Sequence, residues 1–362
     1  MNAGRDATLD AAAANAAVRQ SFHRQAEWCE QLGSPFTALA CRALGAHLTE
    51  ATAFGARVLN WPGDPTRDLV AVRACGALNA LAREGHTALA PLYPPNRLPL
   101  EDRFWLGAQA AIAGDDARLT AFLDSAPQTN EVARSGALLP GCLEIARRAG
   151  LPLAIWEIGA SAGLNLLLDR YFYQYGAFAW GARDAEVTID CEWRGPTPAL
   201  PPTLEIAGRL GCDLLPIDAR DPASRERMLA YIWPDQTARL ARAKAALNLA
   251  AREGVAVEAA DAALFAARRL PLAAPDRVRV LMHSIFWQYL PAPTAAAVRQ
   301  AVARAAGEAT RASPFAWLRM EAEAGEMRGA VVRLSLWPQG PVDASIAVVD
   351  FHGRWLEWRG IA

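Results

Sequence analysis

Between residues 157 and 163 the chain places a carboxylic acid, a hydroxyl and two glycines in close succession, as Glu157, Gly159, Ser161 and Gly163. Glycine at 159 lets the chain turn with unusual backbone angles and come close to a ligand. Glycine at 163 lets a following helix pack near the preceding strand, and the first amides of that helix can receive an anionic group. This segment is therefore the first candidate for a binding site.

Two other chemistries fit parts of the same segment. A dinucleotide site needs G-x-G-x-x-G, but Ser161 takes the middle position and the last glycine comes one residue early. The stretch also matches the G-x-S-x-G nucleophile elbow of serine hydrolases, with Asp261 and either His283 or His352 in the order of a triad. Against a hydrolase, the residues before 150 read as helix, without the strands and oxyanion loop that such an enzyme needs upstream of its elbow.

The apolar run at 153–156, with a proline before it and the glycine-rich turn after it, predicts a buried parallel strand, and a helix is predicted at 164–170. Strands and helices then alternate, which predicts an α/β fold with a doubly wound, mostly parallel sheet. Two closing strands joined by a short Pro/Gly loop predict an antiparallel hairpin at the edge of the sheet. The predicted strands are 204–212, 255–259, 278–283, 315–321, 330–336 and 345–350, and the predicted helices are 223–231, 237–252, 262–269 and 294–306.

The first 150 residues show apolar positions at helical spacing and no β-rich segment, so residues 1–150 are predicted to form an all-helical domain. Residues 151–362 would then form the α/β domain. We expect the helical part to act as a cap over the ligand face and as a wall on the acceptor side.

An aromatic segment at about 171–203 makes the path from Gly163 to Asp213 much longer than the roughly 20 residues of a simple βαβ unit. Two interpretations stay open for this insertion. It walls a pocket for a substrate, or it is a hairpin whose amphipathic rings cover one flank of the sheet.

The acidic-x-Gly-x-Ser-x-Gly pattern from Glu157 resembles the first motif of class I S-adenosylmethionine-dependent methyltransferases, with Ser161 in place of the middle glycine. The resemblance covers roughly residues 151–358 and implies that Glu157, Gly159, Ser161 and Gly163 bind the cofactor. It further implies that Asp213 binds the ribose, and that Asp261 with Ala262 lies at the adenine.

Methyl transfer to an oxygen or nitrogen atom often needs a base within hydrogen-bonding distance of the acceptor. His283 is the first candidate, because it stands at the predicted end of a strand and imidazole titrates near neutral pH. Tyr289 is a second catalytic candidate, and Gln128, Asn130 and Trp287 are candidates for substrate binding. Each has a structural alternative: a hydrogen-bonded core histidine, aromatic core residues, and a helix cap formed by Asn130.

Over its whole length the chain resembles the bacterial family called domain of unknown function 2332, in segments such as Pro127–Val132, Glu157–Leu166, Trp233–Gln236 and Phe351–Trp355. That resemblance implies no reaction. The methyltransferase resemblance predicts S-adenosylmethionine-dependent methylation of an oxygen or nitrogen on a small or medium organic acceptor. The alternatives are a non-catalytic module for cofactor binding or assembly, and a hydrolase that uses Ser161.

The composition excludes several other classes. Lys plus Arg number 37 and Asp plus Glu 38, a net charge of -1, so nucleic acid is not expected as the main partner. The six cysteines are scattered without a CxxC pair, and the histidines lack HxxxH spacing, so neither disulfides nor a metal site is expected. No apolar run is long enough to span a bilayer, so a cytoplasmic protein without membrane contact is predicted. The oligomeric state is not constrained.

Overall fold

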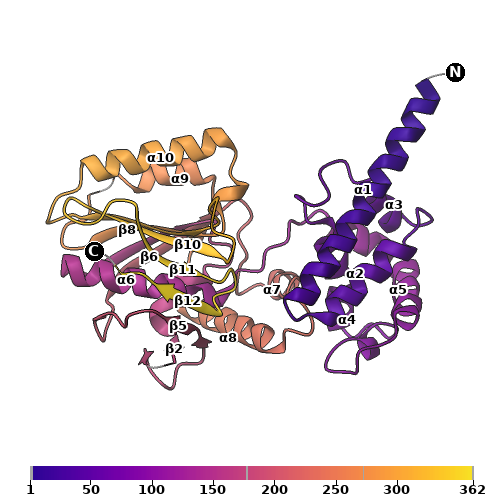
Figure 1. Cartoon of the computed structure of the whole chain (residues 1–362), viewed down its shortest axis with the longest axis horizontal. Helices are drawn as coiled ribbons and strands as arrows, with labels where there is room; N and C mark the ends of the chain where they lie inside the picture. Colours follow the sequence, from indigo (N-terminus) through magenta and orange to yellow (C-terminus); the bar gives the residue numbers. More distant parts are fainter. Residues whose placement is uncertain (1–2, 177, 272, 361–362) are drawn as a thin grey trace. The chain divides into compact units, whose positions relative to one another are not determined.

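The computed structural model describes residues 3–176, 178–271 and 273–360, with side chains from residue 13 onward (Figure 1). Positions 1–2, 177, 272 and 361–362 of the predicted domains and insertion lie outside the described residues. The chain divides into two compact units. The first unit comprises the residues up to Thr129 together with the later segment Pro222–Ala241. The second unit comprises Asn130–Asp221 and the residues from Arg242 onward.

The first unit is a bundle of helices around its own apolar core, as the helical periodicity predicted. Small residues such as Ala38, Ala74 and Ala108 are fully buried where the helices pack closely. Its helices are α1 (Ala3–Gln31), α2 (Pro35–His47), α3 (Ala53–Leu59), α4 (Val70–Arg83), α5 (Glu101–Phe122) and α7 (Pro222–Ala230), with the short 3-10 helix η1 (Ala90–Leu92).

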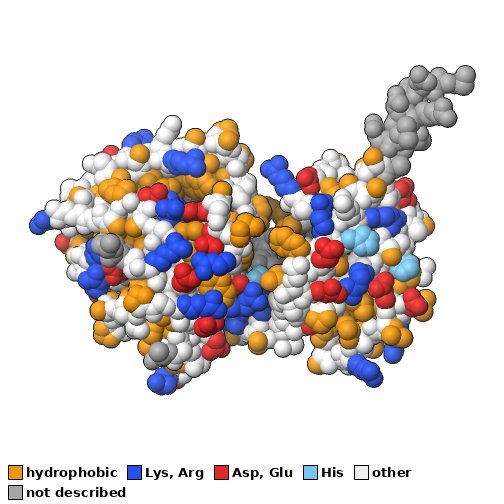
Figure 2. All heavy atoms as spheres, viewed as in Figure 1, with side chains coloured by type: hydrophobic (Ala, Val, Ile, Leu, Met, Phe, Trp, Pro, Cys, Tyr) orange, Lys and Arg blue, Asp and Glu red, His pale blue; other side chains and the backbone are white. Residues whose placement is uncertain are grey.

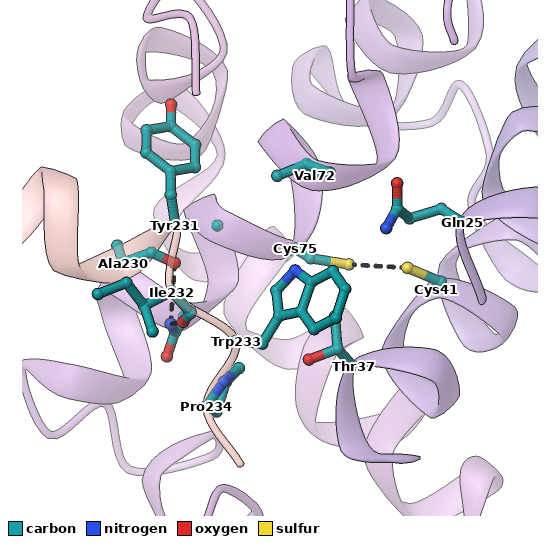
Figure 3. Close-up of a pocket in the computed structure, with 12 residues that line it drawn as sticks. Gln25, Thr37, Cys41, Val72, Cys75, Ala230, Tyr231, Ile232, Trp233 and Pro234 are labelled. Carbon is teal, nitrogen blue, oxygen red and sulfur yellow. Dashed lines mark hydrogen bonds between the residues drawn. The ribbon is translucent and has the colours of Figure 1, made fainter. Parts of the chain in front are cut away.

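Polar side chains join the returning segment to this bundle. The amide of Asn79, on α4, donates to the carbonyl oxygens of Ala230 at 2.9 Å and Ile232 at 3.2 Å. Asp235 accepts a hydrogen bond from the Phe36 amide at 2.9 Å, at the start of α2. Beside these contacts lies a cavity of about 20 Å³, which has room for one water molecule. Figure 3 shows Cys41 and Cys75 pointing toward each other at its wall, with their sulfur atoms 3.6 Å apart.

The second unit contains a nine-stranded sheet of order β5-β12-β11-β10-β9-β8-β1-β6-β7. The five strands from β9 to β7 are all parallel, and β1 lies between β6 and β8, so the connections leave it in both directions. The strands are β1 (Leu153–Ile158), β5 (Glu192–Arg194), β6 (Ile206–Asp213), β7 (Val257–Ala259), β8 (Val278–Ser284), β9 (Phe315–Glu321), β10 (Ala330–Trp337), β11 (Ala344–Val349) and β12 (Trp355–Trp358). A mixed α/β fold with a large, mostly parallel sheet is thus confirmed.

Helices cover both faces of this sheet (Figure 1). On one face α9 (Ala262–Arg269) and α10 (Ala292–Gly307) pack over a core that includes Phe265, Leu281 and Phe315. On the other face lies α6 (Ser135–Ala149), which contacts β8, β9, β10 and β11. The strand β8 is buried along its whole length, including the charged side chain of Arg279.

The predicted antiparallel hairpin is present as β10 and β11, but its predicted place at the edge of the sheet is wrong. Two further strands, β12 and β5, continue the sheet beyond it. Both strands are too short to show a strong periodic pattern in the sequence. The strand β5 comes from the aromatic insertion.

The insertion also forms a small sheet of β2 (Phe172–Gln174), β3 (Ala179–Trp180) and β4 (Thr188–Asp190). Three of its tyrosines are buried, and their hydroxyls donate to backbone carbonyls: Tyr171 to Leu164, Tyr173 to Leu168 and Tyr175 to Gly136. These rings therefore support the segment after β1 and the start of α6 from inside the fold.

Candidate functional site

The turn after β1 has the unusual backbone that its glycines predicted. Gly159, Ser161 and Gly163 have φ angles of 69°, 53° and 70°. A side chain at position 163 would come within 2.7 Å of Val255. The expected helix after this turn is instead the 3-10 helix η3 (Leu164–Arg170), which is kinked at Leu167. Because the element is short and irregular, it offers no helix N-terminus for an anion, and that expectation is corrected.

Side chains of the protein accept hydrogen bonds from the backbone amides of this turn. Asn130 Oδ1 accepts hydrogen bonds from the amides of Ala162 at 3.2 Å and Leu164 at 3.1 Å. Asp213, at the end of β6, accepts from the Ser161 amide at 2.9 Å. Asn130 itself has a positive φ of 35°. The structure therefore brings the predicted residues Asn130, Ser161 and Asp213 together around one turn.

Glu157 is the most perturbed acid of this region. Its side chain is buried, and burial, with a smaller contribution from the charge of Asp213, raises its pKa to about 8 against the opposing effects of an Asn165 hydrogen bond and of Arg134. Three buried polar atoms here have no hydrogen-bond partner among the described residues: Glu157 Oε2, Ser161 Oγ and Asn165 Oδ1. Such a group is costly to leave unpaired, so three close together in sequence mark a place where a polar ligand would be favoured.

Asp261 follows the end of β7, which is the second strand from β1 on this side of the sheet. Its Oδ1 caps α9 by accepting from the amides of Ala263 at 2.8 Å and Leu264 at 3.2 Å. Ala262 is the first residue of that helix and is buried. Near these acids the apolar side chains of Leu214 and Leu264 are largely exposed, at 71% and 64%.

His283, the predicted base, is fully buried at the end of β8. Trp317 Nε1 donates to His283 Nε2 at 3.1 Å, so the proton lies on Nδ1, which donates to Glu321 Oε1 at 2.6 Å. Glu321 also accepts from the Phe286 amide at 3.1 Å. Both ring nitrogens are engaged within the fold, so this geometry favours a positioning role for His283, holding the loop after β8.

The loop after β8 packs against the glycine turn. A side chain at Gly159 would come within 2.2 Å of the Phe286 ring, so only glycine fits here. Trp287 stacks on His283 with ring centroids 5.2 Å apart and has the Arg299 guanidinium over its ring. Tyr289 is 55% exposed. The ring of Phe286 therefore lies directly against the glycine turn.

The segment from Asn130 to Arg134, at the start of the second unit, carries residues that sequence reasoning did not assign to the site. Glu131 is buried, and its carboxylate lies 3.5 Å from Arg242 and 3.7 Å from His352 Nδ1. Arg134 donates to the carbonyl oxygens of Phe351 and Ser284. The polar run before α6 was the only local signal for this group.

Other predicted residues lie elsewhere. Gln128 belongs to the first unit, and its role in substrate binding stays a prediction. At the C-terminal turn Arg354 forms an ion pair with Asp350 at 2.7 Å. The hydrolase triad is not assembled in the described residues, because Ser161 Oγ has no partner while His283 and Asp261 bond to other groups.

The geometry defines a mixed α/β protein whose polar residues gather at the carboxyl ends of β1 and its neighbours. The chain belongs to the family described as an uncharacterised protein conserved in bacteria (DUF2332), whose profile matches residues 19–358. No curated protein and no solved structure matches the chain. Within the described ranges, no helix is both long and apolar enough to cross a membrane. Figure 2 shows Lys and Arg side chains interspersed with Asp and Glu, in keeping with the balanced charge.

Proposed function

We propose that this protein is an S-adenosylmethionine-dependent methyltransferase acting on an oxygen or nitrogen atom of a small or medium organic acceptor. Ligands of doubly wound sheets bind outside the carboxyl ends of the strands, where the connections leave a central strand in opposite directions. Here that point lies beside β1, between β6 and β8. The resemblance to class I methyltransferases concerns the same strand ends, with β7, β6, β1, β8 and β9 side by side.

The observation that carries the proposal is the group of unpartnered buried atoms on Glu157, Ser161 and Asn165. The cofactor's amino-acid end bears an ammonium group and a carboxylate, and its sulfonium is cationic. A buried carboxyl group with a raised pKa gains most from a cation beside it, because the cation favours its ionised form. The hydroxyl of Ser161 can donate to a carboxylate.

The neighbouring strand ends suit a nucleoside. Asp213 would hold the ribose hydroxyls, as the methyltransferase resemblance implies, and Asp261 would lie at the adenine. The exposed Leu214 and Leu264 offer apolar contact for a flat base beside these acids. When bound, the cofactor supplies a methyl group already activated by the sulfonium, so the protein's task is to align the acceptor and exclude water.

Calorimetric titration with S-adenosylhomocysteine tests this proposal. Asp213→Asn keeps the side chain's shape and removes its charge, and we expect it to weaken binding by on the order of 10- to 100-fold. Ser161→Ala removes only an unpartnered hydroxyl and should weaken binding while leaving the thermal midpoint unchanged. Asp218→Asn, at an exposed acid that pairs with Arg220, is the matched control and should bind like the wild type. No heat from the wild type at millimolar ligand would refute the proposal.

A further inference from the structure

The group around Glu131 lies at the same edge of the sheet as the glycine turn. The strand β9 runs parallel to β8, β10 runs antiparallel to β9, and β11 antiparallel to β10. Consequently β11 points in the same direction as β1 and β8, and the turn after it, which holds His352, lies at their carboxyl edge. Residues far apart in sequence are thereby brought to one side of the sheet.

The segment from Asn130 to Arg134 connects these loops. Asn130 bonds to the turn after β1, Arg134 reaches Ser284 O at the end of β8, and Glu131 faces His352. Adjacent α carbons are about 3.8 Å apart, so the contacts to the glycine turn and to His352 come from two neighbouring residues of one segment. Position 353 must be glycine, because a side chain there would meet the Ala133 carbonyl at 2.2 Å.

We propose that His352 is the base that takes the proton of the methyl acceptor, and that Glu131 is the residue that positions it. The proposal rests on the methyltransferase function proposed above. His352 is 27% exposed, whereas the Glu131 carboxyl is almost entirely buried beside its Nδ1. A carboxylate beside Nδ1 holds the proton there and leaves Nε2 with a lone pair, as in acid–base histidines generally. The two atoms lie 3.7 Å apart, beyond hydrogen-bonding distance, and the buried His352 Nδ1 has no hydrogen-bond partner among the described residues. Catalytic hydrogen bonds are often long before the substrate binds and shorten in the complex.

The other charged groups near the pair are consistent with this assignment. Arg242 lies 3.5 Å from the Glu131 carboxylate, so a cation stands beside this buried acid. Asp350 accepts from the His352 backbone amide at 3.0 Å, and its own charge is paired with Arg354. Arg134 donates to the carbonyl of Phe351 beside them.

The proton and electron balance follows from these roles. His352 Nε2 accepts the proton of an O–H or N–H group on the acceptor. The electron pair left on that acceptor atom forms the new bond to the methyl carbon, and the pair of the broken carbon–sulfur bond stays on sulfur. The acceptor class is therefore one whose nucleophile must lose a proton, such as an alcohol, a phenol or a protonated amine.

The tautomer of His352 can be measured on the full chain with ¹⁵N-labelled histidine, with the signal assigned by its loss in His352→Gln. We expect the form with the proton on Nδ1 in the wild type and a mixture of tautomers in Glu131→Gln. A proton found mainly on Nε2, or a tautomer that does not change in Glu131→Gln, would overturn the pairing. His23→Gln, at an exposed helical position, is the control.

Two further measurements separate this inference from the function it rests on. His352→Gln should bind S-adenosylhomocysteine within about 2-fold of the wild type, yet transfer labelled methyl groups to components of a cell extract on the order of 100-fold more slowly. A wild type that does not bind S-adenosylhomocysteine would refute the methyltransferase while leaving the tautomer result standing. Undiminished transfer by His352→Gln, or a wild type that binds and transfers nothing, would refute the role of His352 as the base.

Discussion

At the level of single residues, Glu157 shows how burial changes the chemistry of a side chain. The sequence marks it as an acid beside a glycine turn, which is compatible with either a charged or an uncharged group. In the fold it is buried, and its pKa rises to about 8. The neutral form of the Glu157 carboxyl group is therefore favoured when no cation is bound beside it.

This shift predicts how stability depends on pH. The unfolded carboxyl ionises near its ordinary pKa of 4.5, whereas the folded one stays protonated up to about pH 8, so the folded state binds more protons between these values. Stability should then fall as pH rises through this interval, by about 1 kcal/mol per unit. Glu157→Gln lacks the ionisable group and should lose less stability between pH 5 and pH 8. Urea denaturation of both proteins at several pH values measures the difference, and parallel pH profiles would contradict it.

At the level of elements, the glycine turn and the loop after β8 depend on each other. The ring of Phe286 lies where a side chain at position 159 would be, and Glu321 holds the backbone of that loop through the Phe286 amide. His283 in turn bonds to Glu321. The strand β8 thus positions the turn after β1 through a chain of contacts that includes the predicted catalytic histidine.

Gly159→Ala tests this dependence. It should destabilise the protein by more than about 2 kcal/mol, because it combines a positive φ with a collision against Phe286. Gly150→Ala is the matched control, since Gly150 has a similar φ of 65° and no atom within 4 Å of the added carbon. It should cost about 1 kcal/mol through backbone strain alone.

The double variant isolates the steric part. In a Phe286→Ala background, Gly159→Ala should cost about as much as Gly150→Ala, a coupling of about 1 kcal/mol or more. Chemical denaturation of the single and double variants provides the cycle. Additive effects would show that the ring does not oppose a side chain at position 159.

At the level of the whole molecule, the two units do not follow the order of the chain. The first unit includes the later residues 222–241. The second unit begins at Asn130, so α6 and the polar segment before it belong with the sheet. Eleven successive residues of α6, Ser135–Ile145, are buried. Removing this helix would expose one face of β8 to β11 to water.

Two truncated proteins test this division. A fragment of residues 130–362 should fold with a cooperative thermal transition, because it keeps α6 and the Asn130 contacts with the glycine turn. A fragment of residues 151–362 should aggregate or melt without cooperativity, since it loses both. Circular dichroism during heating distinguishes these results. Equal cooperative folding of both fragments would show that α6 is dispensable to the sheet.

Much of the fold could be predicted from local sequence. The buried strand β1 begins with the apolar run 153–156. The glycines at 159 and 163 mark positions where a positive φ and close packing leave no room for another residue. These signals are local, because burial on both faces and positive φ are requirements on single residues and their immediate neighbours.

The partners of each polar group could not be predicted in this way. Nothing near Glu131 in the chain indicates His352, nothing near Asn79 indicates the carbonyls of Ala230 and Ile232, and nothing in Asn130 indicates the amides it would accept from. Such pairs depend on strand order and on crossovers between distant segments, which are set by how the apolar faces pack. Residue type and local spacing therefore reveal the strands and the glycine turn. Only the packed molecule determines which acids are buried and that the partly exposed His352 lies beside the Glu131 carboxylate.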